Sequence, residues 1–194
     1  GLGKLRKSKF ISIKKEIETP IGLKNTLIKS DCPQFVLRLI KDVKNKNSSD
    51  ELAKRFNSSG IKVISALVDI TNFLTFDRCR PLHVFDFDKI KGKIVIRHSI
   101  DGEKFKGLDA VEYKLTKGMI VICDDLGIIS LAGIMGGERT ACDFTTKNVL
   151  IESAFFSPEK IAWAGRKLSI ESDARYRFER GIDPKSTIEG IELA

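Results

Sequence analysis

The side chains of this chain that could do chemistry begin with one histidine and one glutamate. His83 is one of only two histidines and lies in the mostly apolar segment Arg80–Asp88. A neutral imidazole both donates and accepts hydrogen bonds, so it can orient a bound molecule or place a water. Glu152 lies in the apolar run Ile151–Phe156, where an ionised carboxylate is an acceptor only. Each also fits an ordinary role, a structural histidine at a turn and a strand-end glutamate facing solvent.

The sequence gives little support for a phosphate-binding loop or a metal site. Gly136 and Gly137 predict a tight turn with positive φ, but neither a G-x-G-x-x-G pattern nor a P-loop lysine accompanies them. Asp86 and Asp88 look like strand-end and turn residues rather than metal ligands. The four cysteines are Cys32, Cys79, Cys123 and Cys142. Because they form no C-x-x-C pair, we expect reduced thiols and no zinc site.

The composition is that of a soluble globular protein. Of 194 residues, 42% are hydrophobic and 31% charged, enough for one domain with a core. No apolar run approaches the roughly 20 residues that cross a bilayer, and the first residues lack a signal-peptide pattern. We therefore expect a cytoplasmic protein without a membrane partner.

The charge balance favours an anionic partner. The net charge is +8 and the pI about 9.3, which favours nucleic acid over a membrane surface. Much of the excess is lysine scattered along the chain, which equally fits a solvated surface. A more localised basic set, in which arginines could bind phosphates, consists of Arg166, Lys167, Arg175, Arg177 and Arg180.

The apolar pattern predicts helices early and late, with strands between them. The predicted helices are a short one opened by a capping box at Ser48 and Glu51 and ended by Gly60, then 63–73, 157–168 with Pro158 at its first position, 172–180, and a last one after Pro184. The predicted strands are 35–40, 94–96, 103–105, 111–115, 120–123, 128–131 and 149–151. His98 follows a strand without a motif and is interpreted as a surface residue.

These elements predict an α+β fold with antiparallel or mixed sheets, a layered or barrel-like core and flanking helices. Residues 1–31 look like lead-in strands, with apolar residues at Phe10, Ile11, Ile13 and Ile17. Residues 32–194 form the remaining compact α+β domain.

Several of these segments together resemble the editing domain of the phenylalanyl-tRNA synthetase β subunit, formed by its third and fourth regions. The matching stretches, in order, are 68–72, 81–86, 131–138, 152–156 and 173–183. The likeness covers about Cys32 to Pro184, and its specificity comes from the agreement of several independent blocks.

The resemblance implies hydrolysis of tyrosine from mischarged tRNA-Phe. A synthetic site shaped for phenylalanine rejects the added hydroxyl of tyrosine only about a hundredfold, so a second site must remove the error. The family's glutamate, here Glu152, binds the tyrosine hydroxyl. With phenylalanine the carboxylate loses water and gains no partner, at a cost of about 1–3 kcal/mol.

The resemblance also assigns the remaining site residues. His83 and Glu152 correspond to the catalytic pocket, where His83 orients the substrate or helps to place a water. Gly136 lines the amino-acid pocket, and Ala174 leaves room for the ring. Ser172 stands where the family often has threonine, and Asn72 lies near the substrate or, alternatively, caps a helix. The RNA contacts are expected from Arg166, Arg175 and Arg177.

The implied partners are the 3′ end of tRNA-Phe, the synthetase α subunit and the remainder of the β subunit. No cofactor or metal is expected for the hydrolysis, and ATP and magnesium belong to the full synthetase. Two alternatives stay open, a non-catalytic RNA-binding module and a structural module of the synthetase.

Overall fold

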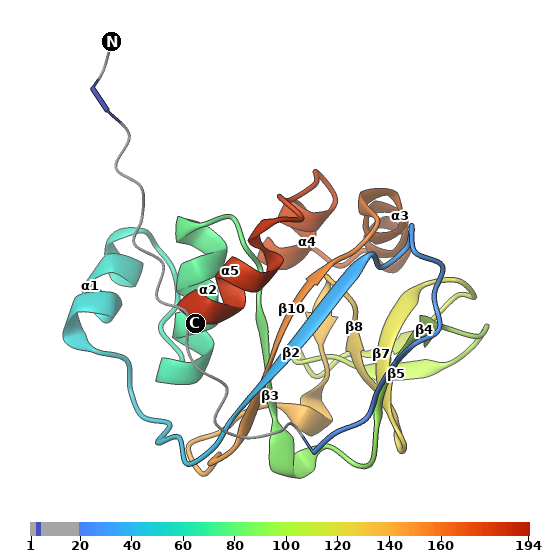
Figure 1. Cartoon of the computed structure of the whole chain (residues 1–194), viewed down its shortest axis with the longest axis horizontal. Coiled ribbons are helices and arrows are strands. Elements are labelled where there is room, and N and C mark those ends of the chain that lie inside the picture. The colour runs from blue at the N-terminus through green and yellow to red at the C-terminus, as the bar shows by residue number, and fades with distance from the viewer. Residues whose placement is uncertain (1–2, 5–19) are drawn as a thin grey trace.

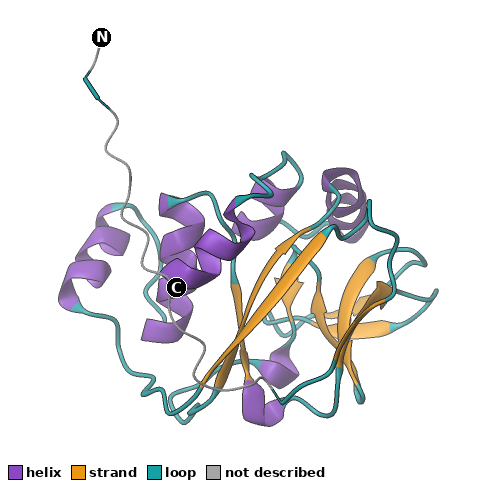
Figure 2. Cartoon of the chain, viewed as in Figure 1, coloured by secondary structure: helices purple, strands orange, loops and turns teal. Residues whose placement is uncertain are grey.

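A computed structural model describes residues 3–4 and 20–194 (Figure 1). The lead-in strands predicted around Phe10, Ile11, Ile13 and Ile17 lie outside the described residues. In the described part, two sheets lie beside each other and helices cover the outer face of the smaller one (Figure 2). No helix among the described residues is long and apolar enough to cross a membrane.

In the described part of the chain, the larger sheet has five strands in the spatial order β1-β4-β7-β8-β9. Their bounds are β1 Leu23–Asn25, β4 Ile94–His98, β7 Ile120–Asp124, β8 Gly127–Leu131 and β9 Met135–Gly136. β1 runs parallel to β4, and the other neighbours are antiparallel. Every residue of the central strand β7 is buried, as expected for a near-continuous apolar run.

The smaller sheet has three antiparallel strands in the order β2-β10-β3. They are β2 Gln34–Ile40, β10 Val149–Phe155 and β3 His83–Asp86. A separate hairpin pairs β5 Lys104–Lys106 with β6 Glu112–Lys114. The predicted α+β class is confirmed, and the sheets are layered rather than closed into a barrel.

Within the described residues, five helices and two short 3₁₀ turns complete the fold. They are α1 Asp50–Ser58, α2 Ala66–Asp77, α3 Pro158–Leu168, α4 Asp173–Phe178, α5 Ser186–Leu193, η1 Phe87–Lys89 and η2 Glu138–Thr140. The start and end of α3 agree with the prediction, because Ser157 caps the helix and Pro158 occupies its first position.

The starts of the first two helices differ from their predictions. The cap of α1 is Ser49, whose side chain accepts from the Leu52 amide, and not Ser48. Ser48 instead donates its hydroxyl to Asp69 of α2 at 2.5 Å. The same carboxylate accepts the Ile64 amide at 3.0 Å, so the chain stays extended up to Ser65 and α2 begins three residues later than predicted.

The two faces of β10 serve different layers. Leu150 and Ala154 belong to the main core shared with the five-stranded sheet. Val149 and Ile151 belong to a second cluster that includes Ile191 of α5. Because side chains alternate along a strand, Glu152 lies on the same face as Leu150 and Ala154, between the two sheets.

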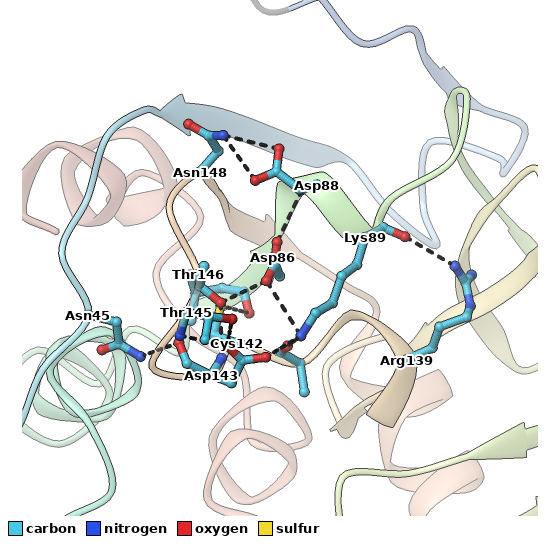
Figure 3. Close-up of polar contacts among 12 residues, drawn as sticks. Asn45, Asp86, Asp88, Lys89, Arg139, Cys142, Asp143, Thr145, Thr146 and Asn148 are labelled. Atoms are coloured by element: carbon cyan, nitrogen blue, oxygen red, sulfur yellow. Dashed lines mark hydrogen bonds and ion pairs between the residues drawn. The ribbon is translucent and has the colours of Figure 1, made fainter.

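A polar network fixes the end of β3 and the loop that leads into β10 (Figure 3). The hydroxyl of Thr146 donates to Asp86 at 2.7 Å, and Asp86 accepts the Asp88 amide at 3.1 Å. Lys89 Nζ lies 2.7 Å from Asp143 and 3.5 Å from Asp86. Asp86 and Asp88 are therefore strand-end and turn residues, as predicted, and they hold the register of β3 against β10.

Candidate functional site

Glu152 and His83 are direct neighbours across two strands. The antiparallel register of β10 and β3 places Glu152 opposite His83, and Leu150 opposite Phe85. Directly opposed residues in an antiparallel pair project to the same face with their Cβ atoms about 5 Å apart. Glu152 is only 6% exposed. The structure therefore brings together the two side chains that the sequence singled out for chemistry.

Gly136 lies against the ring of His83. A Cβ built on Gly136 would fall 2.3 Å from Cε1 and 2.8 Å from Nε2 of His83, and 3.0 Å from a methyl of Leu108. The space that the missing side chain leaves is therefore filled by the imidazole. The prediction of a positive-φ turn at Gly136–Gly137 is wrong: the positive-φ glycine of this segment is Gly133, with φ +66°.

The carboxyl group of Glu152 is buried without a hydrogen-bond donor among the described residues. Burial raises its pKa to about 8, and the charge of Arg80 opposes that rise. The expected ionised acceptor thus forms fully only above about pH 8. At neutral pH the group holds a proton, and a donor that favours the anion would release that proton.

The imidazole of His83 is neutral over the same range. Burial lowers its pKa to about 4, because the low-dielectric surroundings disfavour the charged ring. The ring packs edge-on against Phe85, with 4.3 Å between the ring centroids. Its Nε2 is buried and has no partner within the described residues. A neutral ring with an unpartnered nitrogen can bind a ligand group or a water.

Ser172 and Ala174 join α4 to the segment that carries Gly136. The hydroxyl of Ser172 donates to the Ile134 carbonyl at 2.7 Å and accepts the Arg175 amide at 3.1 Å. Ser172 is thus the N-cap of α4 and also its attachment to the loop before Gly136. Ala174 is half-buried and packs against the main core.

We expect Ser172→Ala to lower the free energy of unfolding by about 1 kcal/mol, because an N-cap hydrogen bond is lost. Ser172→Thr keeps the hydroxyl and serves as the control. Urea unfolding of the three proteins measures the difference. Equal stability of the alanine and threonine variants would remove the capping role.

Asn72 lies in the interior of α2, so the alternative in which it caps a helix end is wrong. Phe76 follows it by one turn on the same face, and the guanidinium of Arg177 stacks on the Phe76 ring at 4.8 Å from its centroid. That contact turns this face of α2 toward α4. The side chain of Asn72 has no hydrogen bond among the described residues, and its substrate contact stays a prediction.

The three arginines predicted to contact RNA differ in their surroundings. Arg175 donates to the Ile170 carbonyl at 2.5 Å, pairs with Glu179 at 3.0 Å and packs on the bare face of Gly165. Arg177 bonds Asp173 at 3.1 Å and is mostly covered. Arg166 is exposed near the end of α3, and its side chain has no partner within the described part of the chain. The RNA contacts stay predictions, and Arg166 is the best placed of the three.

A surface hollow of about 440 Å³ follows the outer face of α4, lined by Glu171, Ser172, Asp173, Arg175, Tyr176, Glu179 and Arg180. It shares Ser172 with the predicted substrate pocket and Arg175 with the predicted RNA contacts, and it does not include Glu152 or His83. Its mixed acidic and basic lining is made of pairs such as Arg175–Glu179. We therefore base the candidate site on the buried Glu152 and the half-buried His83 opposite it, and not on this hollow.

Two further sequence interpretations are tested by the structure. His98 is a half-exposed residue whose Nε2 lies 2.8 Å from Asp31, so it has a buried partner that the sequence did not indicate. The four cysteines are free thiols, with Cys32 and Cys123 buried, Cys142 half-buried and Cys79 exposed. Within residues 3–4 and 20–194, no group of histidine, cysteine and acidic side chains could hold a metal ion.

The comparison with known proteins decides the family. A family model described as "B3/4 domain" matches residues 31–194. The chain belongs to the B3/4 domain family. The chain is 56% identical over 163 residues to a protein named phenylalanine–tRNA ligase beta subunit from Nitrobacter winogradskyi. The matched region covers 84% of this chain and 20% of that relative. A protein of the same name from Mesorhizobium japonicum is 50% identical over 196 residues, covering 100% of the chain and 24% of the relative.

The B3/4 domain therefore spans about a fifth to a quarter of the length of these relatives. Its fold is similar to a crystal structure of an N-terminal fragment of the phenylalanyl-tRNA synthetase beta-subunit from Pyrococcus horikoshii. The TM-score is 0.58 at 19% identity, covering 89% of this chain and 53% of that one. At that identity the likeness supports the fold.

Proposed function

We propose that this chain is the proofreading part of a phenylalanine–tRNA ligase and hydrolyses tyrosine from mischarged tRNA-Phe. The observation that carries the proposal is the buried Glu152 carboxyl, in register with His83, whose imidazole packs against Gly136. The names of the relatives support a role within the ligase.

Tyrosine and phenylalanine differ by one hydroxyl, and Glu152 supplies the group that can detect it. A phenol that donates to the buried carboxyl replaces the water lost on binding. A phenylalanine ring leaves the same carboxyl without a partner, which costs about 1–3 kcal/mol. Selection thus acts chiefly by excluding the bare ring, as in other sites built to bind a substrate hydroxyl.

The reaction is hydrolysis of the ester between tyrosine and the terminal ribose. A water oxygen bonds to the ester carbonyl carbon, the bond from that carbon to the ribose oxygen breaks, and the ribose hydroxyl leaves with a proton. His83 is neutral and offers one acceptor or donor at its unpartnered Nε2, so it can hold the water or the substrate. Positioning supplies most of the rate in this account.

The proposed partners follow from the same function. The 3′ end of tRNA-Phe brings the ester to the site, and the α subunit with the rest of the β subunit provides the remaining tRNA contacts. The hydrolysis needs no cofactor, whereas ATP and magnesium serve aminoacylation in the full synthetase. The location that we propose for this assembly is the cytoplasm.

A deacylation assay tests the proposed function. The chain is mixed with Tyr-tRNA-Phe or Phe-tRNA-Phe, and release of the amino acid is followed against spontaneous hydrolysis. We expect faster release of tyrosine and little effect on phenylalanine. Binding of the tRNA without faster tyrosine release would favour a non-catalytic RNA-binding module instead.

We expect Ala174→Trp to abolish tyrosine release, because an indole at this half-buried position of α4 fills the space for the ring. Ala174→Ser is the small-residue control and should retain activity. Thermal unfolding followed by circular dichroism confirms that both variants fold. A folded and fully active tryptophan variant would place the pocket elsewhere.

A further inference from the structure

A second buried charge lies close to the candidate site. Arg80 is 0% exposed. Its guanidinium donates to the Ser186 hydroxyl at 2.9 Å, the Ala154 carbonyl at 2.6 Å and the Asp183 carbonyl at 3.0 Å. A further bond reaches the hydroxyl of Thr187 at 3.2 Å. All four acceptors are neutral, so no carboxylate within the described residues neutralises the guanidinium by direct contact.

The fold makes room for this guanidinium and sets its position. A Cβ on Gly190 of α5 would lie 2.5 Å from the Arg80 side chain. The absence of a side chain at Gly190 therefore leaves the space in which Arg80 packs against the helix. β3 pairs with β10 only as far as Glu152. Beyond that point β3 no longer pairs with β10, and the Ala154 carbonyl, in a residue still paired with β2, is bound by Arg80. The guanidinium therefore lies two residues along β10 from Glu152.

Arg80 and Glu152 act on each other without touching. Burial raises the pKa of Glu152 to about 8, and the charge of Arg80 opposes the rise. Burial lowers the pKa of Arg80 to about 10, and Glu152 opposes that change together with Asp183. Two buried charges of opposite sign, each without an ion-pair contact, thus reduce each other's cost of burial.

Two other titratable groups near Glu152, His83 and Cys32, are neutral around the pKa of Glu152. His83 across the strand has a pKa lowered to about 4 by burial. The Cys32 thiol has a pKa raised to about 12, first by burial and then by the charge of Glu152. The charge of Asp31 also raises the pKa of the Cys32 thiol, and the charge of Asp183 raises the pKa of Arg80. Among the described residues, Arg80 is therefore the cation that favours ionisation of Glu152.

We propose that Arg80 is a positioning residue of this site, whose buried charge allows Glu152 to ionise and so to accept a hydrogen bond from a hydroxylated ring. The inference rests on the proposed function for the identity of the ring. The coupling between Arg80 and Glu152 is a property of the chain itself and can be measured without any substrate.

Ser186→Asp tests the coupling, with Ser186→Asn as the matched neutral control. Ser186 is the first residue of α5 and binds Arg80, so an aspartate there is favourable for the helix and neutralises the guanidinium. The readout is a ¹³C NMR titration of glutamate carboxyl groups, in which the Glu152 signal is assigned by its loss in Glu152→Gln. We expect the aspartate to raise the titration midpoint by about one pH unit and the asparagine to leave it unchanged. An unchanged midpoint in the aspartate variant overturns the inference.

Substitution of Arg80 separates its charge from its hydrogen bonds. Arg80→Lys keeps the charge and loses part of the bonding, so we expect a lower melting temperature and a midpoint close to the original. Arg80→Met removes both and should raise the midpoint by at least about one pH unit. Equal midpoints for lysine and methionine contradict the inference. If the methionine variant does not fold, the Ser186 pair still decides.

The proofreading function and the coupling between Arg80 and Glu152 are tested by different results. A shifted midpoint with no preference for tyrosine over phenylalanine would remove the proposed function and leave the coupling. A preference for tyrosine with an unshifted midpoint in Ser186→Asp would keep the proposed function and remove the role of Arg80.

Discussion

Gly136→Ala is expected to lower the rate of tyrosine release by about a hundredfold, since a displacement of about 1 Å in a reacting group can cost that much. The added methyl group would fall 2.3 Å from Cε1 and 2.8 Å from Nε2 of His83. The two cannot coexist, so the ring must move from its place opposite Glu152. The deacylation rate with Tyr-tRNA-Phe measures the effect, and circular dichroism confirms the fold.

A double-mutant cycle with His83→Ala provides the control. If Gly136→Ala acts by displacing the imidazole, it should have almost no further effect once the imidazole is absent. Losses that multiply in the double variant would mean that Gly136 contributes independently of His83. Full activity of Gly136→Ala alone would remove His83 from the site.

Glu152→Gln is expected to reduce the preference for tyrosine over phenylalanine by about 5- to 150-fold, which corresponds to the 1–3 kcal/mol cost of an unpartnered buried group. Glutamine has nearly the same shape but cannot ionise, so it accepts the phenol hydrogen bond less strongly and penalises phenylalanine less. The ratio of kcat/KM for the two aminoacyl-tRNAs measures the preference. Glu112→Gln, at an exposed glutamate of β6, is the control and should leave the ratio unchanged.

The same residue should make the preference depend on pH. The pKa of Glu152 is raised to about 8, so the anion that accepts best becomes populated as the pH rises through 8. The tyrosine preference should rise from pH 7 to 9, below the ionisation of the tyrosine phenol near pH 10. It should be flat in Glu152→Gln. A preference that falls over this range would contradict an acceptor role.

Part of the arrangement around Glu152 could be predicted because it depends on local sequence signals. The alternation of Leu150, Glu152 and Ala154 along β10 puts a carboxyl on the apolar core face, and a lone glutamate in such a run is visible in the sequence. The cap and first proline of α3 are likewise local signals. The family resemblance then linked Glu152 to His83, which the strand register confirms as neighbours.

The parts that could not be predicted depend on contacts between distant segments. Arg80 looks like an ordinary charged residue before a strand, because its four acceptors lie more than seventy residues away along the chain. Glu152 was expected to be an ionised carboxylate. Its pKa of about 8 depends on its own burial and on the charge of the buried Arg80. Gly136 was assigned to the pocket, yet the side chain that fills its bare face, His83, lies in another sheet.

The predicted starts of α1 and α2 were wrong for a related reason. Ser48 and Ser49 are both good capping residues, and the choice between them is made by Asp69, which accepts the Ser48 hydroxyl. The same carboxylate holds Ile64 before α2 begins. A single buried aspartate thus sets two helix starts, and its position is known only after folding.

The most direct test is a crystal of this chain soaked with tyrosine, with phenylalanine as the parallel soak. We expect the phenol oxygen of the bound tyrosine within about 3 Å of a Glu152 carboxyl oxygen, and no ordered phenylalanine at the same place. A Glu152 carboxyl turned to bulk solvent, or a tyrosine bound equally well with its phenol away from Glu152, would contradict this expectation.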